Sequence, residues 1–351
     1  MKKIIVAFIA VCIVATMALI GVGCTTTAAS ETTAAAGEAA ETTAAAGEAA
    51  ETTAAPVAGG ELKLALVPKV VHPWFDIVNI GAQEMANLLT ENTNTKVTVE
   101  YIAPASADVA EQNMILQNAA AKQVDGIIID PLDVDGSAQV FEEIQAQGIL
   151  VTLFDLAAFD DWTSVTSTDV DIVNAEMTRL MDLIGGKGKV AVMQGFPTAP
   201  SHKQRYDLFK ELVPKLYPNV ELIEGGVDND DMETARQQAA ATIAANPDLV
   251  GYLVCDAAGP VGVGQAIKEA GKVGEIQCVG MGEMTSILDL VKEGVLESTV
   301  YIYPDMQGSY SVMLHYMNYL GVPIPKQVDM GVKYIDKTNV DEYLGRFATT
   351  G

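Results

Sequence analysis

From Glu61 onward, the chain alternates between two patterns of hydrophobic positions. Short runs are almost continuously apolar, and the longer stretches between them repeat their apolar residues about every 3.6 positions. A continuous apolar run is typical of a strand buried on both faces, and the longer period is typical of a helix with one buried face. We predict strands over residues 62–68, 97–104, 126–131, 149–155, 189–194, 220–224, 250–256, 276–281 and 299–303.

Helices are predicted between these strands. The segment 108–123, for example, opens with Asp108 and has Glu111 three residues later, a spacing typical of a capping box. Buried strands that alternate with helices imply parallel sheets covered by helices, so the predicted fold class is α/β. Roughly four strand–helix units precede residue 165 and roughly four more precede residue 302, which predicts two lobes of similar size. The chain after residue 302 is too short for a third domain, so we expect it to return to these lobes.

Three of the predicted strands end at a proline, namely Pro68, Pro104 and Pro131. Because proline lacks a backbone donor and stops a ladder, these strands share a defined carboxyl edge. Ligands of open parallel α/β sheets bind at that edge. Lys69, His72, Trp74 and Phe75 follow the first strand directly and lie where a ligand is expected.

The composition narrows the class of partner. The chain has 351 residues, 49% of them hydrophobic, and a formal net charge of −25. Such an acidic surface argues against nucleic acid and anionic membranes as partners, because both require basic patches. The charge is compatible with a soluble exported protein.

The N-terminus has the features of a secretory signal. Lys2 and Lys3 precede an apolar run over 4–20, and small residues lead to Cys24. We predict a signal peptide over 1–23. The alternative is an uncleaved anchor, for which the apolar run is barely long enough.

A ten-residue repeat follows the signal. The sequence ETTAAAGEAA stands at 31–40 and again at 41–50. It contains no large apolar side chain and cannot offset the entropy of ordering, so we predict a disordered spacer over 24–60. Two later cysteines, Cys255 and Cys278, each lie in an apolar run; we favour two buried thiols over a disulfide, because the predicted strands place them out of register.

Several segments in order resemble the type I periplasmic substrate-binding proteins of ABC importers, the branch that includes ribose-, galactose- and autoinducer-2-binding proteins. The resemblance covers residues 61–344. Its landmarks are LALVPKVVHPWF, ADVAEQNMILQNAAAKQVDGIIIDPLD, GILVTLFD, GYLVCDAAGPVGVGQAIKEAG and VLESTVYIYPDMQGSYSVMLHYMNYLG. The GVGC stretch also resembles the lipobox of bacterial lipoproteins, which implies that Cys24 carries a lipid.

The resemblance implies two Rossmann-like lobes joined by a three-segment hinge. The first lobe would comprise 61–168 and 303–331, and the second 169–302 and 332–351. The crossings would lie near 167–170, 302–305 and 329–333. The family closes on a small molecule like a clamshell.

The resemblance also implies the ligand contacts. Trp74 and Phe75 match aromatic residues that stack on a sugar, although either could instead pack as core. Asp155 and Asp256 match polar contacts from the two lobes, while Asp130 is a candidate at the rim whose alternative is a structural turn. Further candidates are Lys69, His72, His202, Lys203, Glu283 and Tyr303.

Two departures from the sugar-binding pattern leave the ligand open. Gly282 stands where many relatives carry an aspartate, and Ile302 stands where they carry a glutamine. The resemblance therefore favours a monosaccharide or related sugar, with a nucleoside, polyol, autoinducer-like furanose or amine as alternatives. It implies an ABC permease as partner and a monomer tethered by its lipid to the outer face of a Gram-positive-type cell membrane; a lipid-tethered sensor is the alternative role.

No enzymatic motif competes with this interpretation. The glycine-rich segments 185–189 and 259–264 lack the spacing of a Walker motif and of the dinucleotide fingerprint after the first strand. Three histidines in the chain leave little for a metal site or a triad. We therefore predict a binding protein with no enzymatic activity, cofactor or metal.

Overall fold

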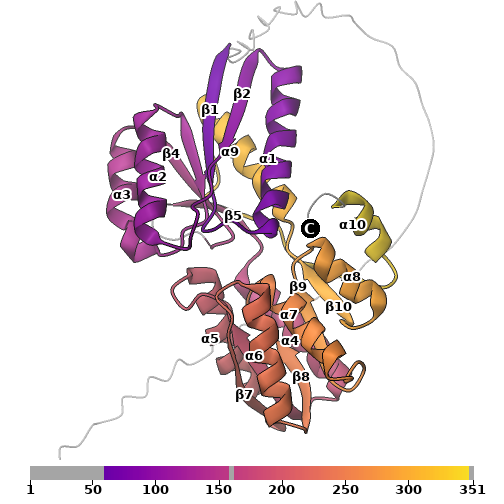
Figure 1. Ribbon diagram of the computed structural model, residues 1–351. Coiled ribbons are helices and arrows are strands. Elements are labelled where there is room, and N and C mark those ends of the chain that lie inside the picture. Colours follow the sequence, from indigo (N-terminus) through magenta and orange to yellow (C-terminus); the bar gives the residue numbers. More distant parts are fainter. Residues whose placement is uncertain (1–58, 158–161, 348–351) are drawn as a thin grey trace, which may run out of the picture. The chain divides into compact units, whose positions relative to one another are not determined.

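The computed structural model describes residues 59–157 and 162–347. Within these ranges the chain forms two six-stranded sheets, each flanked by helices, which confirms the predicted α/β class (Figure 1). The predicted signal peptide, Cys24 and most of the predicted spacer lie outside the described residues. No helix among the described residues combines the length and the apolar character needed to cross a membrane.

The first sheet has the strand order β11-β5-β4-β3-β1-β2, and all its pairs are parallel. Its elements are β1 (Gly60–Val67), α1 (Pro73–Asn92), β2 (Thr95–Tyr101), α2 (Val109–Ala121), β3 (Gly126–Ile129), α3 (Val134–Ala146), β4 (Leu150–Phe154), β5 (Thr163–Thr166), α9 (Pro304–Tyr319) and β11 (Gln327–Asp329). Leu64 and Leu66 of β1 pack toward α1, and Ala65 and Val67 pack in the cluster under α2 and α3. The strand is therefore buried on both faces, as its apolar run predicts.

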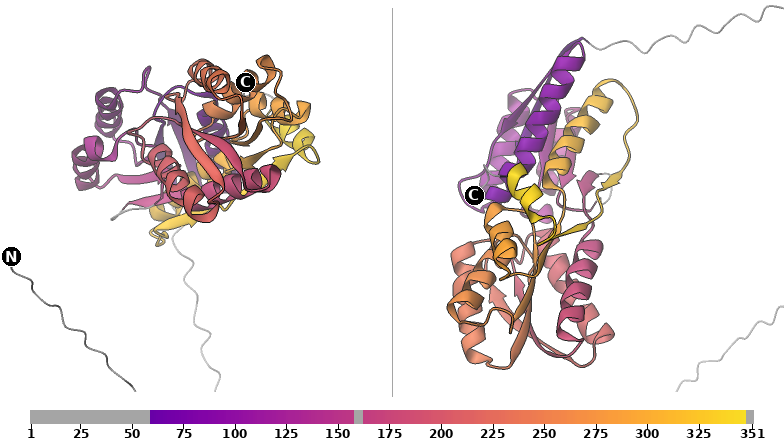
Figure 2. Two further views of the ribbon diagram at one scale, coloured as in Figure 1. Left: turned by 90° about the horizontal axis from the view of Figure 1, so that it is seen from below. Right: turned by 90° about the vertical axis from the view of Figure 1, so that its right-hand side faces the viewer.

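Helices α1 and α9 lie side by side although more than 200 residues separate them (Figure 2). Glycine makes this approach possible at two positions. A Cβ on Gly81 would come within 1.8 Å of the Asp305 carbonyl oxygen, and one on Gly308 within 2.0 Å of the Val78 carbonyl oxygen. The return of α9 to the first lobe therefore depends on backbone contact.

The second sheet has the order β12-β10-β9-β8-β6-β7, with only β12 antiparallel to its neighbour. Its elements are α4 (Asp169–Ile184), β6 (Gly188–Gln194), α5 (Pro200–Leu216), β7 (Val220–Val227), α6 (Met232–Ala245), β8 (Leu249–Leu253), α7 (Ala258–Glu269), β9 (Gln277–Met281), α8 (Thr285–Glu293), β10 (Ser298–Tyr301), β12 (Lys333–Asp336) and α10 (Val340–Arg346). The described chain thus passes between the lobes after β5, after β10 and after β11. Ser167 Oγ donates to the Ile302 carbonyl oxygen at 2.9 Å and joins the first two crossings.

Each predicted strand has a counterpart within a few residues, but β5, β11 and β12 were not predicted. These three strands have three or four residues each and carry polar side chains, so they leave no apolar run. The expected buried thiols are confirmed, because Cys255 and Cys278 are both free and buried.

Candidate functional site

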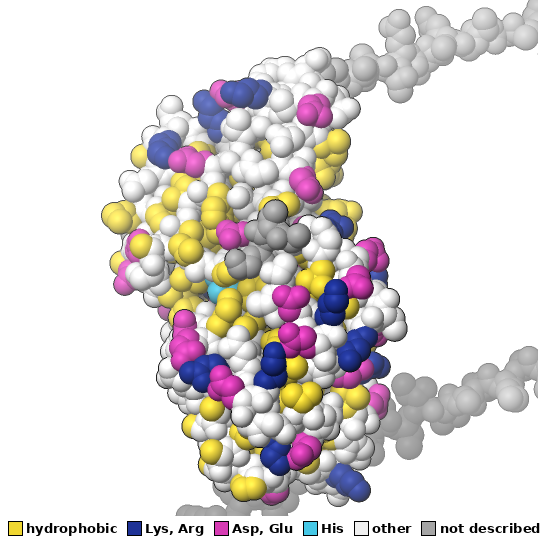
Figure 3. Space-filling model, turned by 45° about the vertical axis from the view of Figure 1, so that its right-hand side comes forward, with side chains coloured by type: hydrophobic (Ala, Val, Ile, Leu, Met, Phe, Trp, Pro, Cys, Tyr) yellow, Lys and Arg dark blue, Asp and Glu magenta, His cyan; other side chains and the backbone are white. Residues whose placement is uncertain are grey.

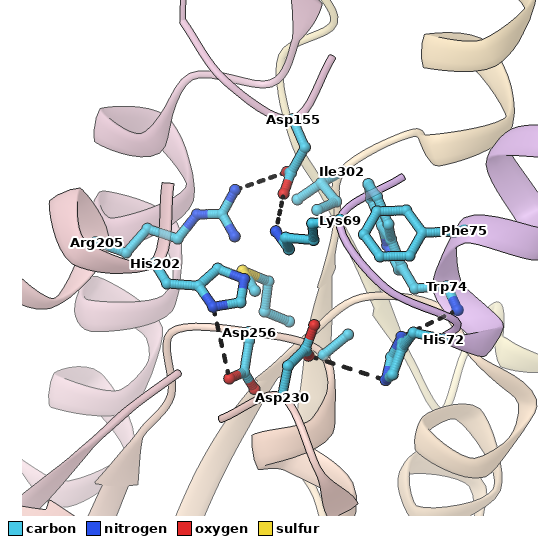
Figure 4. Close-up of a pocket in the computed structure, with 12 residues that line it drawn as sticks. Lys69, His72, Trp74, Phe75, Asp155, His202, Arg205, Asp230, Asp256 and Ile302 are labelled. Carbon is cyan, nitrogen blue, oxygen red and sulfur yellow. Dashed lines mark hydrogen bonds and ion pairs between the residues drawn. The ribbon is translucent and has the colours of Figure 1, made fainter. Parts of the chain in front are cut away.

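A pocket lies between the lobes, where loops from the carboxyl edges of both sheets meet (Figure 4). Its walls are formed by Lys69, His72, Trp74, Phe75, Asp155, His202, Arg205, Asp230, Asp256, Ala257, Met281 and Ile302. The space between these side chains is about 270 Å³, but the centre of a water molecule can move within only about 20 Å³ of it. One water needs about 10–15 Å³ on that second measure, so a sugar-sized molecule requires the walls to move apart.

The aromatic wall begins at the start of α1. His72 is the N-cap, and its Nδ1 accepts from the Trp74 backbone N–H at 3.3 Å. Pro73 occupies the first turn, where its missing donor costs nothing. This start turns Trp74 and Phe75 into the pocket wall, with their rings edge to face at 5.2 Å.

Trp74 also contacts the opposite lobe. Its Nε1 donates to Glu283 Oε2 at 3.1 Å, and Glu283 Oε1 accepts from the Ile302 backbone N–H at 3.2 Å. Burial raises the pKa of Glu283 well above its usual value, despite these donors. The predicted ligand contact Glu283 therefore lies behind Trp74 rather than on the pocket wall.

Lys69 is the buried cation of the first lobe, with 1% of its surface exposed. Its Nζ lies 2.9 Å from Asp130 Oδ2 and 3.6 Å from Asp155 Oδ2. Burial disfavours the charged form, but the carboxylates of Asp130, Asp155 and Asp230 outweigh it and raise the pKa of Lys69. Burial also raises the pKa of Asp130 to about 7, against the opposing effect of Lys69. Asp130 supports Lys69 from outside the wall.

Asp155 of the first lobe forms a buried ion pair with the second lobe. It follows β4 with a φ of 52°, a left-handed conformation that aspartate tolerates. Its Oδ1 accepts from Arg205 Nη2 at 2.8 Å, while Arg205 Nε donates to Asp169 Oδ1 at 2.6 Å. Burial opposes the charge of Arg205, but the two carboxylates raise its pKa.

The second lobe contributes an acidic wall. Asp230 lies 3.9 Å from His72 Nε2, and Asp256 Oδ2 lies 4.0 Å from His202 Nδ1. Burial and the nearby cations Lys69 and Arg205 lower the pKa of His202 well below its usual value, so this ring is neutral. Behind this wall, burial and the Asp256 carboxylate raise the pKa of Asp228 to about 11, so Asp228 keeps its proton.

The structure brings most of the predicted site residues to this pocket, with Asp130 and Glu283 in support behind it. Two predicted residues lie elsewhere. Lys203 is exposed on α5 and forms an ion pair with Asp207. Tyr303 is the N-cap residue of α9, and its ring packs on that of Tyr301 with 4.2 Å between the ring centroids. Lys203 is two positions from Arg205, which places it on the opposite side of the helix.

Two charged wall residues, Arg205 and Asp230, were not predicted as ligand contacts, and neither were the apolar wall residues Ala257, Met281 and Ile302. A signal for Arg205 exists, because it falls in the four-residue spacing that also buries Phe209 and Val213. Asp230 stands in the polar segment after β7, at the same carboxyl edge as the other loops. No group of three or more His, Cys, Asp or Glu within the described ranges is arranged to hold a metal ion.

The exposed surface is mixed in charge on the face that Figure 3 shows. The face in Figure 3 carries acidic and basic side chains interspersed over both lobes. Many are exposed ion pairs, such as those of Lys210 with Glu224 and Lys268 with Glu293. Exposed pairs of this kind add little stability, so the charges that matter for the site are the buried ones.

Comparison with known proteins shows which proteins this chain resembles. The chain is similar to the D-ribose/D-allose-binding protein of Pseudomonas aeruginosa, with 21% identity over 58% of this chain and 66% of that protein, just under two thirds of its length. A solute-binding protein of an ABC transporter from Agrobacterium vitis, solved with alpha-D-tagatopyranose, matches at 25% identity and a TM-score of 0.74, over 82% of this chain and 98% of that one. A sugar-binding protein of a sugar ABC transporter from Bacillus halodurans matches at 27% identity and a TM-score of 0.71, over 80% and 99%.

The family model described as "Periplasmic binding protein domain" matches residues 64–320, most of the two lobes. That range holds all the walls of the pocket and the first two crossings between the lobes. The chain belongs to the periplasmic binding protein family.

Proposed function

We propose that this chain captures a monosaccharide or a related polyol in the pocket between its lobes and delivers it to an ABC permease. The observation that supports this proposal most directly is the chemistry of the pocket walls: an aromatic pair from one lobe faces buried charged groups from the other. The family supports this proposal, since it is a non-enzymatic family of solute-binding proteins that act outside the cytoplasm with ABC transporters, and relatives are named for sugars.

A sugar ring fits such walls chemically. Its C–H face is apolar and packs on aromatic rings, and its rim donates and accepts hydrogen bonds. Trp74 and Phe75 supply the apolar surface. Asp155 and Asp256 supply carboxylates that accept from hydroxyl groups with charge-assisted strength.

The proposed mechanism is closure of the lobes around the ligand. The wall side chains leave too little space for a sugar to enter, so capture begins with the lobes apart. A ligand that touches both lobes favours the closed form only by its difference in affinity for the two forms. A micromolar ligand corresponds to roughly 8 kcal/mol of binding free energy.

The location is proposed from the N-terminal sequence. We infer that Cys24 is lipidated and that the repeat tethers the domain outside the cell membrane. Radioactive palmitate should label the full chain, and Cys24→Ser should abolish the label and release the protein to the medium. Equal labelling of both forms would contradict the lipid anchor.

Binding is testable through the two tryptophans, Trp74 in the pocket and Trp162 in the cluster under α2 and α3. In Trp162→Phe, the intrinsic fluorescence reports on Trp74 alone. Native mass spectrometry of this variant identifies a co-purified molecule, and titration with sugars, polyols and nucleosides should change the emission with micromolar midpoints. The proposal fails if no sugar or polyol binds at millimolar concentration, or if a nucleoside alone does.

A further inference from the structure

The charges around the pocket do not balance. Its two cations, Lys69 and Arg205, already face three carboxylates. Asp155 contacts both cations, Asp130 contacts the lysine and Asp169 contacts the arginine. Burial raises the pKa of Asp169 to about 6, and the arginine keeps it from rising further, so Asp169 is charged at neutral pH. The positive charges of Lys69 and Arg205 are therefore balanced by protein carboxylates without any ligand.

The acidic wall is compensated less, because Lys69, whose pKa the Asp230 carboxylate helps to raise, is already paired with Asp130 and Asp155. Asp230 and Asp256 line the pocket with 9% and 1% of their surfaces exposed. Asp228 keeps its proton and hydrogen bonds to Asp256, so these two carboxyls carry one negative charge between them. Together with Asp230, the wall carries roughly two negative charges in a buried site, where an uncompensated charge is costly.

His202 does not supply the missing positive charge. His72 Nδ1 accepts from the Trp74 backbone N–H, and His202 Nδ1 accepts from the Phe196 backbone N–H at 3.0 Å. A ring nitrogen that accepts carries no proton, and burial lowers the pKa of His202 well below its usual value, so His202 is neutral. The nitrogen that approaches Asp256 is thus an acceptor and donates nothing to it.

Unsatisfied polar atoms point to the same place. His72 Nε2 and Asp256 Oδ2 are both buried; the first has no acceptor, and the second accepts from no N–H. The 3.9 Å between His72 Nε2 and Asp230 is too long for a hydrogen bond. Gly195 keeps the neighbouring gap open, because a Cβ there would lie 2.3 Å from both Asp256 Oδ2 and His202 Nδ1. Figure 4 shows Asp230 and Asp256 on one side of the pocket, across from Asp155.

We propose that the ligand is a polyhydroxylated amine, such as an amino sugar, whose ammonium group lies against Asp230 and Asp256. This inference rests on the proposed function and specifies its ligand. An ammonium brings one positive charge and three donors to a wall with excess negative charge and a carboxylate oxygen that accepts from no N–H. The nearby rings of Trp74 and Phe75 favour a cation as well as a C–H face.

The test is isothermal titration of the full chain, solubilised in a non-sugar detergent, with matched ligand pairs. The pairs are D-glucosamine with D-glucose, D-galactosamine with D-galactose, D-mannosamine with D-mannose, and an amino-deoxy-inositol with myo-inositol. In at least one pair the amine should bind tenfold or more tightly at pH 7. Its affinity should fall as the pH passes the pKa of its own amine, whereas that of the neutral partner should not.

Variants of the acidic wall test whether Asp230 and Asp256 cause the preference for the amine. Asp230→Asn keeps the left-handed backbone, which asparagine also adopts, and removes one negative charge. Asp256→Asn keeps an oxygen for the 2.7 Å hydrogen bond from the Gly259 backbone N–H. Each should reduce the amine preference about tenfold, measured as the ratio of the amine and neutral-sugar affinities within the same variant. Asp207→Asn removes a charge from exposed α5 and serves as the control.

The outcomes separate the two proposals. Neutral sugars that bind as well as, or better than, their amines overturn the inference and leave the proposed function standing. An amine preference that survives both pocket variants also overturns it, because the charge then acts elsewhere. If no pair binds but an acyclic diamine such as putrescine does, both proposals fail.

Discussion

Replacement of Arg205 by methionine tests whether the buried ion pairs between the lobes hold this fold. The Arg205 side chain is 2% exposed and donates to Asp155 in the first lobe and to Asp169 in the second. Methionine fills much of the same volume but leaves both carboxylates without their cation. Removal of one partner from a buried pair costs about 3–5 kcal/mol, so we expect a loss of that size.

The matched control is Arg236→Met on α6. Arg236 also has two carboxylate partners, Glu233 and Glu269, but its side chain is 28% exposed and theirs are 58% and 57% exposed. Exposed pairs contribute about 0–1 kcal/mol. Urea unfolding followed by circular dichroism should therefore separate the two variants by at least about 2 kcal/mol at pH 7.5.

The pH dependence of the stability loss in Arg205→Met gives a second readout. The pKa of Asp169 in the folded chain is about 6, above its ordinary value of 3.8, because burial outweighs Arg205. A carboxyl whose folded pKa is raised stabilises the fold at low pH and loses that contribution as the pH rises through the folded pKa. Without Arg205 this pKa rises further, so the deficit of Arg205→Met should shrink between pH 8 and pH 5.5. Equal losses for the arginine variants, or a deficit independent of pH, would refute the reasoning.

Three further predictions concern other buried contacts. Trp74→Phe removes the donor to Glu283 Oε2, and thermal unfolding should show a loss of about 1–3 kcal/mol; an unchanged melting temperature would exclude a stabilising role for this bond. Burial raises the pKa of Glu176 well above its usual value, so its folded form holds a proton above pH 5 that the unfolded form lacks. Glu176→Gln should therefore gain stability relative to the parent as the pH rises from 5 to 8, and a difference that does not change with pH would contradict this. Gly81→Ala should cost more than 2 kcal/mol in urea unfolding, because its Cβ would lie 1.8 Å from the Asp305 carbonyl oxygen; Gly345→Ala, with open space around it, is the control.

The strands could be predicted from the sequence wherever a buried strand consists of a continuous run of apolar residues. Strands such as β3 and β9 are buried on both faces and read as apolar runs. The strand β5 is also buried, but its sequence is TSVT, so its burial leaves no apolar run in the sequence. The short strands β11 and β12 form because hinge segments lie beside sheets that already exist.

The site was predicted as far as one loop at a time allows. Lys69 and Asp155 both line the pocket: the family resemblance implied Asp155, and the carboxyl-edge argument from local sequence placed Lys69 there. It does not tell Lys203 from Arg205, because helix phase decides which of them turns inward. Nor does it show that the Trp74 indole N–H is bonded to Glu283, since that contact joins residues 209 apart in the chain.

The hinge and the pocket share one residue, Ile302. Its carbonyl oxygen accepts from Ser167 Oγ at 2.9 Å and from Gln307 Nε2 at 2.8 Å, and its N–H donates to Glu283. Gln307 Oε1 accepts in turn from the Asp155 backbone N–H at 2.9 Å. The second crossing segment is thus hydrogen bonded to Glu283 and, through Gln307, to Asp155, and both of these residues form contacts between the lobes.

This arrangement determines what opening must break. Asp155 and Gln307 both belong to elements of the first lobe, so their bond survives when the lobes separate. The bonds from Trp74 to Glu283 and from Arg205 to Asp155 join opposite lobes, and opening removes both. A ligand held against Trp74 and Asp155 therefore adds to contacts that already favour closure, so its differential affinity for the closed form needs to supply only part of the closing free energy.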